Sequence, residues 1–216
     1  REVLANFLND TRGLPVTADN LLLTRGATMG IYLTARVITQ PGDHIIMSEP
    51  GFRFARELFH QLQLNINKVP VDEHGLDVNA VERICKTKKI RFVYTVPHHH
   101  YPTTVTMPPE RRIRLLELAK TYNFAIIEDD YDYDFHYTSK PMMPIASIDR
   151  YGSVVYIGTL TKTLAPAVRI GFLIANEKFV NYAASYRKSI DFQGDTFLEL
   201  AIAELYRDGT IARHIK

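Results

Sequence analysis

The sequence contains one cysteine, no long apolar run and almost no excess of charge of either sign. The lone thiol of Cys85 cannot form a disulfide within the chain, so we expect a reducing compartment, the cytoplasm. No stretch approaches the roughly eighteen consecutive apolar residues of a membrane-spanning helix, and residues 1–10 lack the apolar core of a signal peptide. The sequence therefore predicts a cytoplasmic protein that does not contact a membrane.

The charge balance argues against nucleic-acid binding by this segment itself. The 26 basic and 24 acidic side chains leave a net charge of +2, too little for the broad basic face that binds a phosphate backbone. We interpret the short basic run at residues 86–91 as a solvated helix end and loop. Apolar residues make up 46% and charged residues 23%, as in ordinary globular proteins.

Helical and strand patterns alternate along the chain, which predicts the α/β class with a mainly parallel sheet flanked by helices. Helices are expected at 1–11, 26–39, 54–61, 78–85, 110–122 and, interrupted at Asp208-Gly209, over 195–216. Strands are expected at 21–24, 44–48, 64–70, 90–96, 125–127 and 154–157. No internal boundary divides residues 1–216, so we expect one domain, and the unfinished final helix suggests a fragment of a longer protein.

Polar residues follow two of these strands, at the sheet edge where ligands of open α/β sheets bind. One group is Glu128 to Tyr131, and the other is Gly158 to Lys162. A partly desolvated lysine after a buried strand becomes a nucleophile for carbonyl groups. On spacing alone, however, a solvated surface lysine is the more common occupant of such a position.

Nearby donors make the lysine segment a candidate phosphate site. Thr159, Thr161 and Arg169 supply hydroxyls and a planar cation, while Gly26-Ala27-Thr28 opens a helix whose N–H groups can receive an anion. A nucleotide-binding phosphate loop is excluded, because it requires glycine where Thr161 stands.

Three other chemistries fit the sequence poorly. The acidic run from Asp130 resembles a calcium loop, but Phe135 replaces its turn glycine and Pro141 its bidentate glutamate. Of the three histidines 98–100, only alternate ones can converge, and no cysteine or HExxH partner accompanies them, so we expect hydrogen-bonding loop histidines and no metal. No Gly-x-Ser-x-Gly sequence supplies a hydrolase nucleophile.

Three motifs in order resemble the large domain of fold-type I aminotransferases, which depend on pyridoxal 5′-phosphate (PLP), and in particular the aminotransferase-like module of MocR/GntR-type transcriptional regulators. They are Ile126-Ile127-Glu128-Asp129-Asp130-Tyr131-Asp132, His99-His100-Tyr101-Pro102-Thr103, and residues 156–166 (YIGTLTKTLAP) with Arg169. The resemblance covers nearly the whole chain.

The resemblance implies a role for each candidate residue. Lys162 would form the Schiff base with PLP, and Asp129 would pair with the pyridine nitrogen, which keeps the ring an electron sink. Tyr131 would donate to the phenolic oxygen, and Phe52 would stack on the ring. The phosphate would lie among Gly26, Ala27, Thr28, Thr159, Thr161 and Arg169.

Two positions depart from the common pattern of the catalytic enzymes. Tyr101 stands where many aminotransferases have an asparagine against the phenolic oxygen, and the regulators also carry an aromatic residue there. Thr104 replaces the glycine of the usual Pro-Thr-Gly sequence. The first departure favours a sensor over an efficient transaminase, and the second affects the shape of the loop.

The resemblance implies a PLP-binding module that senses a small amino compound as part of a homodimeric regulator. Its DNA-binding domain would precede Arg1, and a small domain carrying the substrate-carboxylate arginine would follow Lys216. Two alternatives stay open: a catalytically active class I/II aminotransferase that transfers an amino group between an amino acid and a 2-oxo acid, and a decarboxylase or lyase on the same fold.

Overall fold

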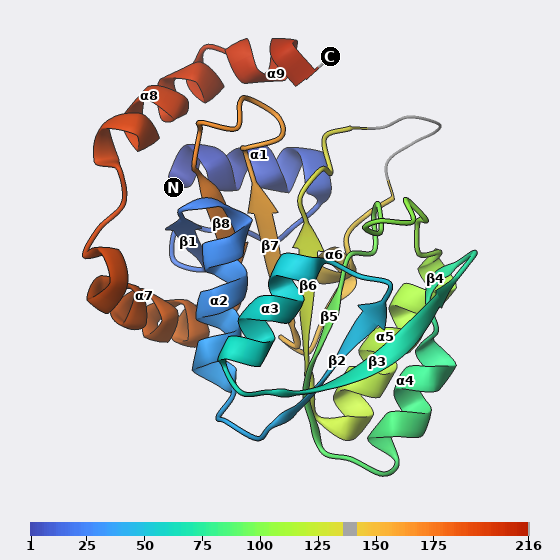
Figure 1. Ribbon diagram of the computed structural model, residues 1–216. Helices are drawn as coiled ribbons and strands as arrows, with labels where there is room; N and C mark the ends of the chain where they lie inside the picture. The colour runs from blue at the N-terminus through green and yellow to red at the C-terminus, as the bar shows by residue number, and fades with distance from the viewer. Residues whose placement is uncertain (136–141, 216) are drawn as a thin grey trace.

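The computed structural model describes residues 1–135 and 142–215 (Figure 1). Pro141, one of the two residues used above against a calcium loop, lies outside the described residues. Within them, no helix is long and apolar enough to cross a bilayer.

The strands in the described ranges form one eight-stranded sheet in the order β1-β8-β7-β6-β5-β2-β3-β4. Their bounds are β1 Leu21–Thr24, β2 His44–Glu49, β3 Asn65–Asp72, β4 Gly75–Leu76, β5 Ile90–Thr95, β6 Ala125–Asp130, β7 Val154–Thr159 and β8 Gly171–Ile174. The central strands β7, β6, β5, β2 and β3 are parallel, whereas β8 and β1 at one edge and β4 at the other pair antiparallel with their neighbours. The predicted α/β class with a mainly parallel sheet is confirmed.

Helices cover both faces of this sheet (Figure 1). Their bounds are α1 Glu2–Arg12, α2 Gly26–Ile38, α3 Arg53–Gln61, α4 Val78–Cys85, α5 Pro109–Tyr122, α6 Ile145–Ile148, α7 Glu177–Asp191, α8 Thr196–Arg207 and α9 Thr210–Ile215. Local signals explain where several of them begin and end. The Asp77 side chain accepts from the backbone N–H groups of Asn79 and Ala80 at the start of α4, and Gly13 ends α1 in the left-handed conformation at φ +59°.

The alternation of side chains along each strand divides the core between the two faces. Ile127 and Ile157 pack in one apolar cluster with helices α2, α3 and α7. Ile126 packs on the opposite face with α4 and α5. Tyr156 packs on that second face in a separate cluster with α1 and α8. The two sides of β6 and β7 therefore face different helices, which decides where their polar residues point.

Most predicted elements are confirmed within one or two residues, but four were missed: β4, β8, α6 and α7. One predicted boundary was wrong. The strand expected to end at Ile127 continues to Asp130, so three carboxylates lie inside β6 and not in a loop after it. Strand pairing with β7 extends to Asp130, and buried hydrogen-bond partners accommodate acidic residues that a strand would otherwise exclude.

Candidate functional site

The three carboxylates of β6 are buried, and the pleat sends them to opposite faces of the sheet. Glu128 accepts from the backbone N–H groups of Ile145 and Ala146 at 2.8 Å and so holds the start of α6. Asp130 accepts from the hydroxyl of Tyr156 at 2.9 Å on the same face. Asp129 points to the other face, where it lines a cavity.

This cavity has a volume of about 340 Å³ and brings together residues from segments far apart in the sequence. It is lined by Ala27, Thr28, Phe52, Phe54, Tyr94, Val96, Tyr101, Asp129, Tyr131, Thr159, Thr161, Lys162 and Arg169. Every predicted site residue except Gly26 is among them. Gly26 lies next to Arg169, one of the lining residues. Its φ is +74°, and a Cβ atom built on it would come within 2.6 Å of Nη2 of Arg169.

Asp129 is the acidic group of the cavity. Its Oδ2 accepts from the Tyr94 hydroxyl at 2.6 Å, while its Oδ1 is buried and has no hydrogen-bond partner among the described residues. Burial raises the pKa of Asp129 to about 7, with the Tyr94 hydrogen bond acting against the shift and the charges of Asp130 and Asp132 adding to it. A ligand with a cationic N–H group would supply the partner that Oδ1 lacks among the described residues.

Lys162 lies in the turn after β7 and its side chain is exposed. The expectation that this lysine would be partly desolvated by the chain itself was therefore wrong. The strand that precedes it is fully buried, but the chain leaves the sheet at Leu160, and the turn carries the side chain to the open rim of the cavity. Only a ligand or another chain segment would remove water from it.

Hydroxyls and a guanidinium gather beside this turn. The Thr159 hydroxyl donates to that of Thr161 at 3.0 Å, and the Thr161 hydroxyl donates to the Val168 carbonyl at 2.9 Å. Nη1 of Arg169 lies 3.4 Å from Oγ1 of Thr161. Strand β8 packs closely against the start of α2. A Cβ atom built on Gly171 would lie only 2.4 Å from the carbonyl carbon of Gly26. The packing holds the first N–H groups of α2 next to these donors.

Aromatic side chains form the remaining wall. The rings of Phe52 and Tyr101 meet edge to face with centroids 5.9 Å apart, and Phe54 lies 5.7 Å from Phe52. The Tyr131 hydroxyl donates to the His99 carbonyl at 3.3 Å, and burial raises the pKa of Tyr131. The cavity thus combines acidic and basic groups with an aromatic wall.

The loop after β5 is fixed by His100, as expected of a hydrogen-bonding histidine. Its two ring nitrogens lie 2.8 Å from Oγ1 of Thr103 and 2.9 Å from Oγ of Ser48. Thr104, which replaces the usual glycine, has φ +61°, a conformation that strains a β-branched residue. The threonine therefore keeps the backbone shape that a glycine would provide.

Tyr94 is the functional candidate that the sequence analysis missed. It lies in β5, is fully buried and donates to Asp129 in the neighbouring strand. Its signal was a phenol hydroxyl in a mostly buried strand, next to the strand that carries the carboxylates. Only the register of β5 against β6 turns that signal into a contact.

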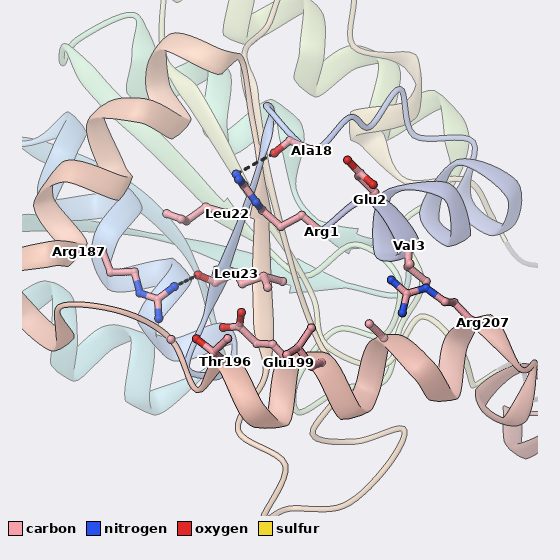
Figure 2. Close-up of a pocket in the computed structure, with 13 residues that line it drawn as sticks. Arg1, Glu2, Val3, Ala18, Leu22, Leu23, Arg187, Thr196, Glu199 and Arg207 are labelled. Carbon is pink, nitrogen blue, oxygen red and sulfur yellow. Dashed lines mark hydrogen bonds between the residues drawn. The ribbon is translucent and has the colours of Figure 1, made fainter.

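A second cavity, of about 430 Å³, lies between α1, β1 and α8 (Figure 2). Its basic residues already have partners: Nη1 of Arg1 donates to the Ala18 carbonyl at 2.9 Å, and Nη1 of Arg187 donates to the Leu23 carbonyl. It shares no lining residue with the cavity at Lys162. The larger cavity therefore is not the candidate functional site.

Comparison with known proteins gives matches over the whole chain. The family model described as aminotransferase class I and II matches residues 1–214. The aromatic-amino-acid aminotransferase 1 of Thermococcus litoralis is 32% identical over 220 residues, covering 100% of this chain and 53% of that protein. The HTH-type transcriptional regulator TauR of Rhodobacter capsulatus is 31% identical over 189 residues, covering 88% of this chain and 38% of the regulator.

A solved structure agrees with the fold. The kynurenine aminotransferase of Pyrococcus horikoshii, crystallised with PMP, superposes with a TM-score of 0.95 at 31% sequence identity and covers 100% of this chain and 54% of that one. The chain thus spans about half the length, or less, of the curated relatives it matches.

Proposed function

Because this chain belongs to the class I and II aminotransferase family, with PLP as its cofactor, we propose that it is the PLP-binding, amino-compound-sensing module of a MocR/GntR-type transcriptional regulator. Lys162 is the residue that holds the cofactor covalently. DNA binding would belong to a separate domain of the longer protein.

The cavity fits PLP in its most demanding feature, the ring nitrogen. Asp129 lines the cavity, its Oδ1 is a buried acceptor without a partner among the described residues, and a protonated pyridine nitrogen is a donor that could supply one. When PLP is bound, its ring supplies an electron sink for amino compounds attached to it. Asp129 keeps the ring nitrogen protonated, and Tyr94 holds the carboxylate in place.

The remaining residues would contact the other parts of the cofactor: its phosphate, its ring and its phenolic oxygen. Thr159, Thr161 and Arg169, together with the first N–H groups of α2 at residues 26–28, bind the phosphate. Phe52 stacks on the ring. The Tyr131 hydroxyl, which donates to the His99 carbonyl at 3.3 Å in this structure, turns to the phenolic oxygen when the cofactor is bound. Each of these cofactor-binding residues except Gly26 lines the cavity, which supports the assignment.

Tyr101 is the residue that favours a sensor over a catalytic aminotransferase. It lines the cavity, is 48% exposed and packs edge-on against Phe52, in the place where many catalytic aminotransferases have an asparagine. A phenol on the cavity rim is a different hydrogen-bonding group from a carboxamide. The similarity to a regulator over 88% of the chain points the same way.

The second candidate function is a catalytically active aminotransferase. The 32% identity to an aromatic-amino-acid aminotransferase supports it, and so does the aromatic wall formed by Phe52, Phe54 and Tyr101. Both functions use Lys162 in the same way, so cofactor binding alone does not separate them.

Product analysis with the full-length, PLP-loaded protein separates these functions. We expect amino compounds to change the absorption spectrum while 2-oxo acid accumulates to no more than about one equivalent per site. Catalytic formation of 2-oxo acid over many cycles would establish the aminotransferase instead, and release of carbon dioxide would indicate a decarboxylase. In parallel, DNA binding measured with and without the amino compound should change if the module is a sensor.

We also propose that the module is a homodimer. Helix α8 and the residues before it expose large apolar side chains to an unusual degree: Phe192 is 80% exposed, Phe197 85% and Leu200 60%. Apolar side chains gathered on one surface are typical of a protein interface.

Phe197→Glu should therefore shift the protein from dimer to monomer, since a charge would be buried against the second subunit. Sedimentation velocity over a range of protein concentrations measures this, with Lys178→Glu on an exposed part of α7 as the control. A Phe197→Glu protein that stays dimeric at low micromolar concentration would place the interface elsewhere.

A cytoplasmic location remains part of the proposal. The Cys85 thiol is free and buried, and burial raises its pKa to about 11, so it stays protonated and unreactive. Such a thiol is consistent with a reducing compartment.

A further inference from the structure

We propose that the Asp134 carboxylate, held by Arg12, positions the Lys162 turn through the hydroxyl of Thr163. The inference rests on the proposed role of Lys162 and concerns residues that do not line the cavity. They would act through the backbone next to the lysine, as positioning residues.

The link consists of two contacts on one carboxylate. The Thr163 hydroxyl donates to Oδ2 of Asp134 at 3.0 Å, and Nη2 of Arg12 donates to Oδ1 of Asp134 at 3.0 Å. The side chains of Arg12 and Asp134 are only 3% and 8% exposed, and Thr163 is buried. Solvent therefore screens this ion pair far less than a surface pair.

Arg12 is itself fixed from several sides. Its Nη1 donates to the Tyr156 hydroxyl at 2.6 Å, and that hydroxyl donates to Asp130. The guanidinium carbon lies 4.6 Å from the ring centre of Tyr133. Burial alone would lower the pKa of Arg12, but Tyr156, Asp134 and Asp130 outweigh it and raise the pKa, so the cation persists at any working pH.

The two threonines beside Lys162 are anchored on opposite sides. Thr161 lines the cavity and bonds to the Val168 carbonyl, whereas Thr163 turns away from the cavity to Asp134. The Thr163 carbonyl is also 2.9 Å from Nε2 of His214 in α9. The lysine backbone is thus held between two fixed neighbours, although its side chain is exposed.

Such anchoring has a consequence for a lysine that must meet a carbonyl carbon. Covalent attachment requires the amine to approach within a narrow range of positions, and a fixed backbone reduces the freedom lost on the way. The buried ion pair ties that backbone to the last turn of α1, more than a hundred residues away in sequence.

The test compares Thr163→Val, Thr163→Ser and Asp134→Asn with the parent in the full-length protein, using PLP as the probe. The readouts are the PLP dissociation constant, the fraction of Lys162 fixed by borohydride reduction and located by mass spectrometry, and the pH midpoint of the absorption band. Thr121→Val is the matched control, because the Thr121 hydroxyl bonds only to the Glu117 carbonyl within α5 in the described structure.

Thr163→Val should weaken PLP binding roughly tenfold and shift the pH midpoint, since it removes one hydrogen bond to a charged group. Thr163→Ser and the control should resemble the parent. Asp134→Asn should also weaken binding, because the amide keeps an acceptor for one of the two bonds but removes the negative charge that faces the buried Arg12.

The outcomes distinguish this link from the assignment of Lys162. Normal PLP binding and an unchanged midpoint in Thr163→Val, with Lys162 still the labelled residue, would overturn the link alone. Equal losses in the valine and serine variants would also overturn it, because the hydroxyl would not be the cause. Labelling at another lysine would refute the proposed function. If Thr163→Val fails to fold, Asp134→Asn decides, and parent-like values there would reject the link.

Discussion

Lys162→Ala is expected to abolish covalent attachment of PLP and with it the absorption band near the visible edge. The described cavity has no other lysine among its lining residues, so no second amine is placed to replace it. After borohydride reduction, mass spectrometry should find the cofactor on Lys162 in the parent and on no residue in the variant. Loss should be essentially complete, since a covalent bond is removed and not merely weakened.

Lys178→Ala provides the control, because Lys178 is exposed on α7 and does not line the cavity. Its spectrum should match that of the parent. An unchanged band in Lys162→Ala would show that the cofactor is attached elsewhere, and the assignment of the strand-following lysine would be wrong. Residual noncovalent binding of PLP in Lys162→Ala is compatible with the assignment, because the phosphate contacts remain.

Asp129→Asn should change cofactor affinity and the stability of the cofactor-free protein in opposite directions. The amide keeps an acceptor for Tyr94 but loses the negative charge that a protonated ring nitrogen needs. Affinity for PLP should fall roughly 10–100-fold, as expected when a charge-assisted hydrogen bond is lost. Fluorescence or absorbance titration at pH 8 measures the change.

The cofactor-free protein should instead become more stable at high pH. Burial raises the folded-state pKa of Asp129 to about 7, above its value of about 4 in an unfolded chain. The folded state therefore binds more protons than the unfolded state between these values, so the parent loses stability as the pH rises from about 4 through 7. Asparagine does not titrate and avoids that loss.

Urea denaturation of the cofactor-free parent and variant at several pH values measures this effect. The variant should gain on the order of 2–4 kcal/mol in its free energy of unfolding above pH 7 and almost nothing at pH 4. Asp10→Asn, on the exposed side of α1, is the control and should show neither effect. A variant equally destabilised at both pH values would mean that the carboxylate is structural and carries no buried charge.

Periodicity and turn residues predicted most of the fold because each of those signals is local. The alternation of apolar segments with glycine and proline predicted the parallel strands, and Gly13 predicted the end of α1. The missed strand β8 is only four residues long and follows an irregular turn, so it exists through pairing with β7 and β1 and not through a pattern of its own.

The candidate site was also predicted only in part from the sequence. The motifs identified Lys162, Asp129 and Arg169 as candidates, but five acidic residues lie close together between 128 and 134, and composition does not say which faces a ligand. The pleat of β6 turns Asp129 to the cavity and its two neighbours away. Burial then gives Asp129 its raised pKa.

By itself, the sequence of this protein determined the α/β class, the order of its motifs and the lysine at the end of a buried strand. The tertiary structure alone decided that Tyr94 holds Asp129, that Lys162 is exposed and that Thr163 bonds to Asp134, the ion-pair partner of Arg12 in α1. Motifs and turns depend on residues that are neighbours in the sequence. A contact between distant strands depends instead on the register of the strands and on the face to which each side chain points.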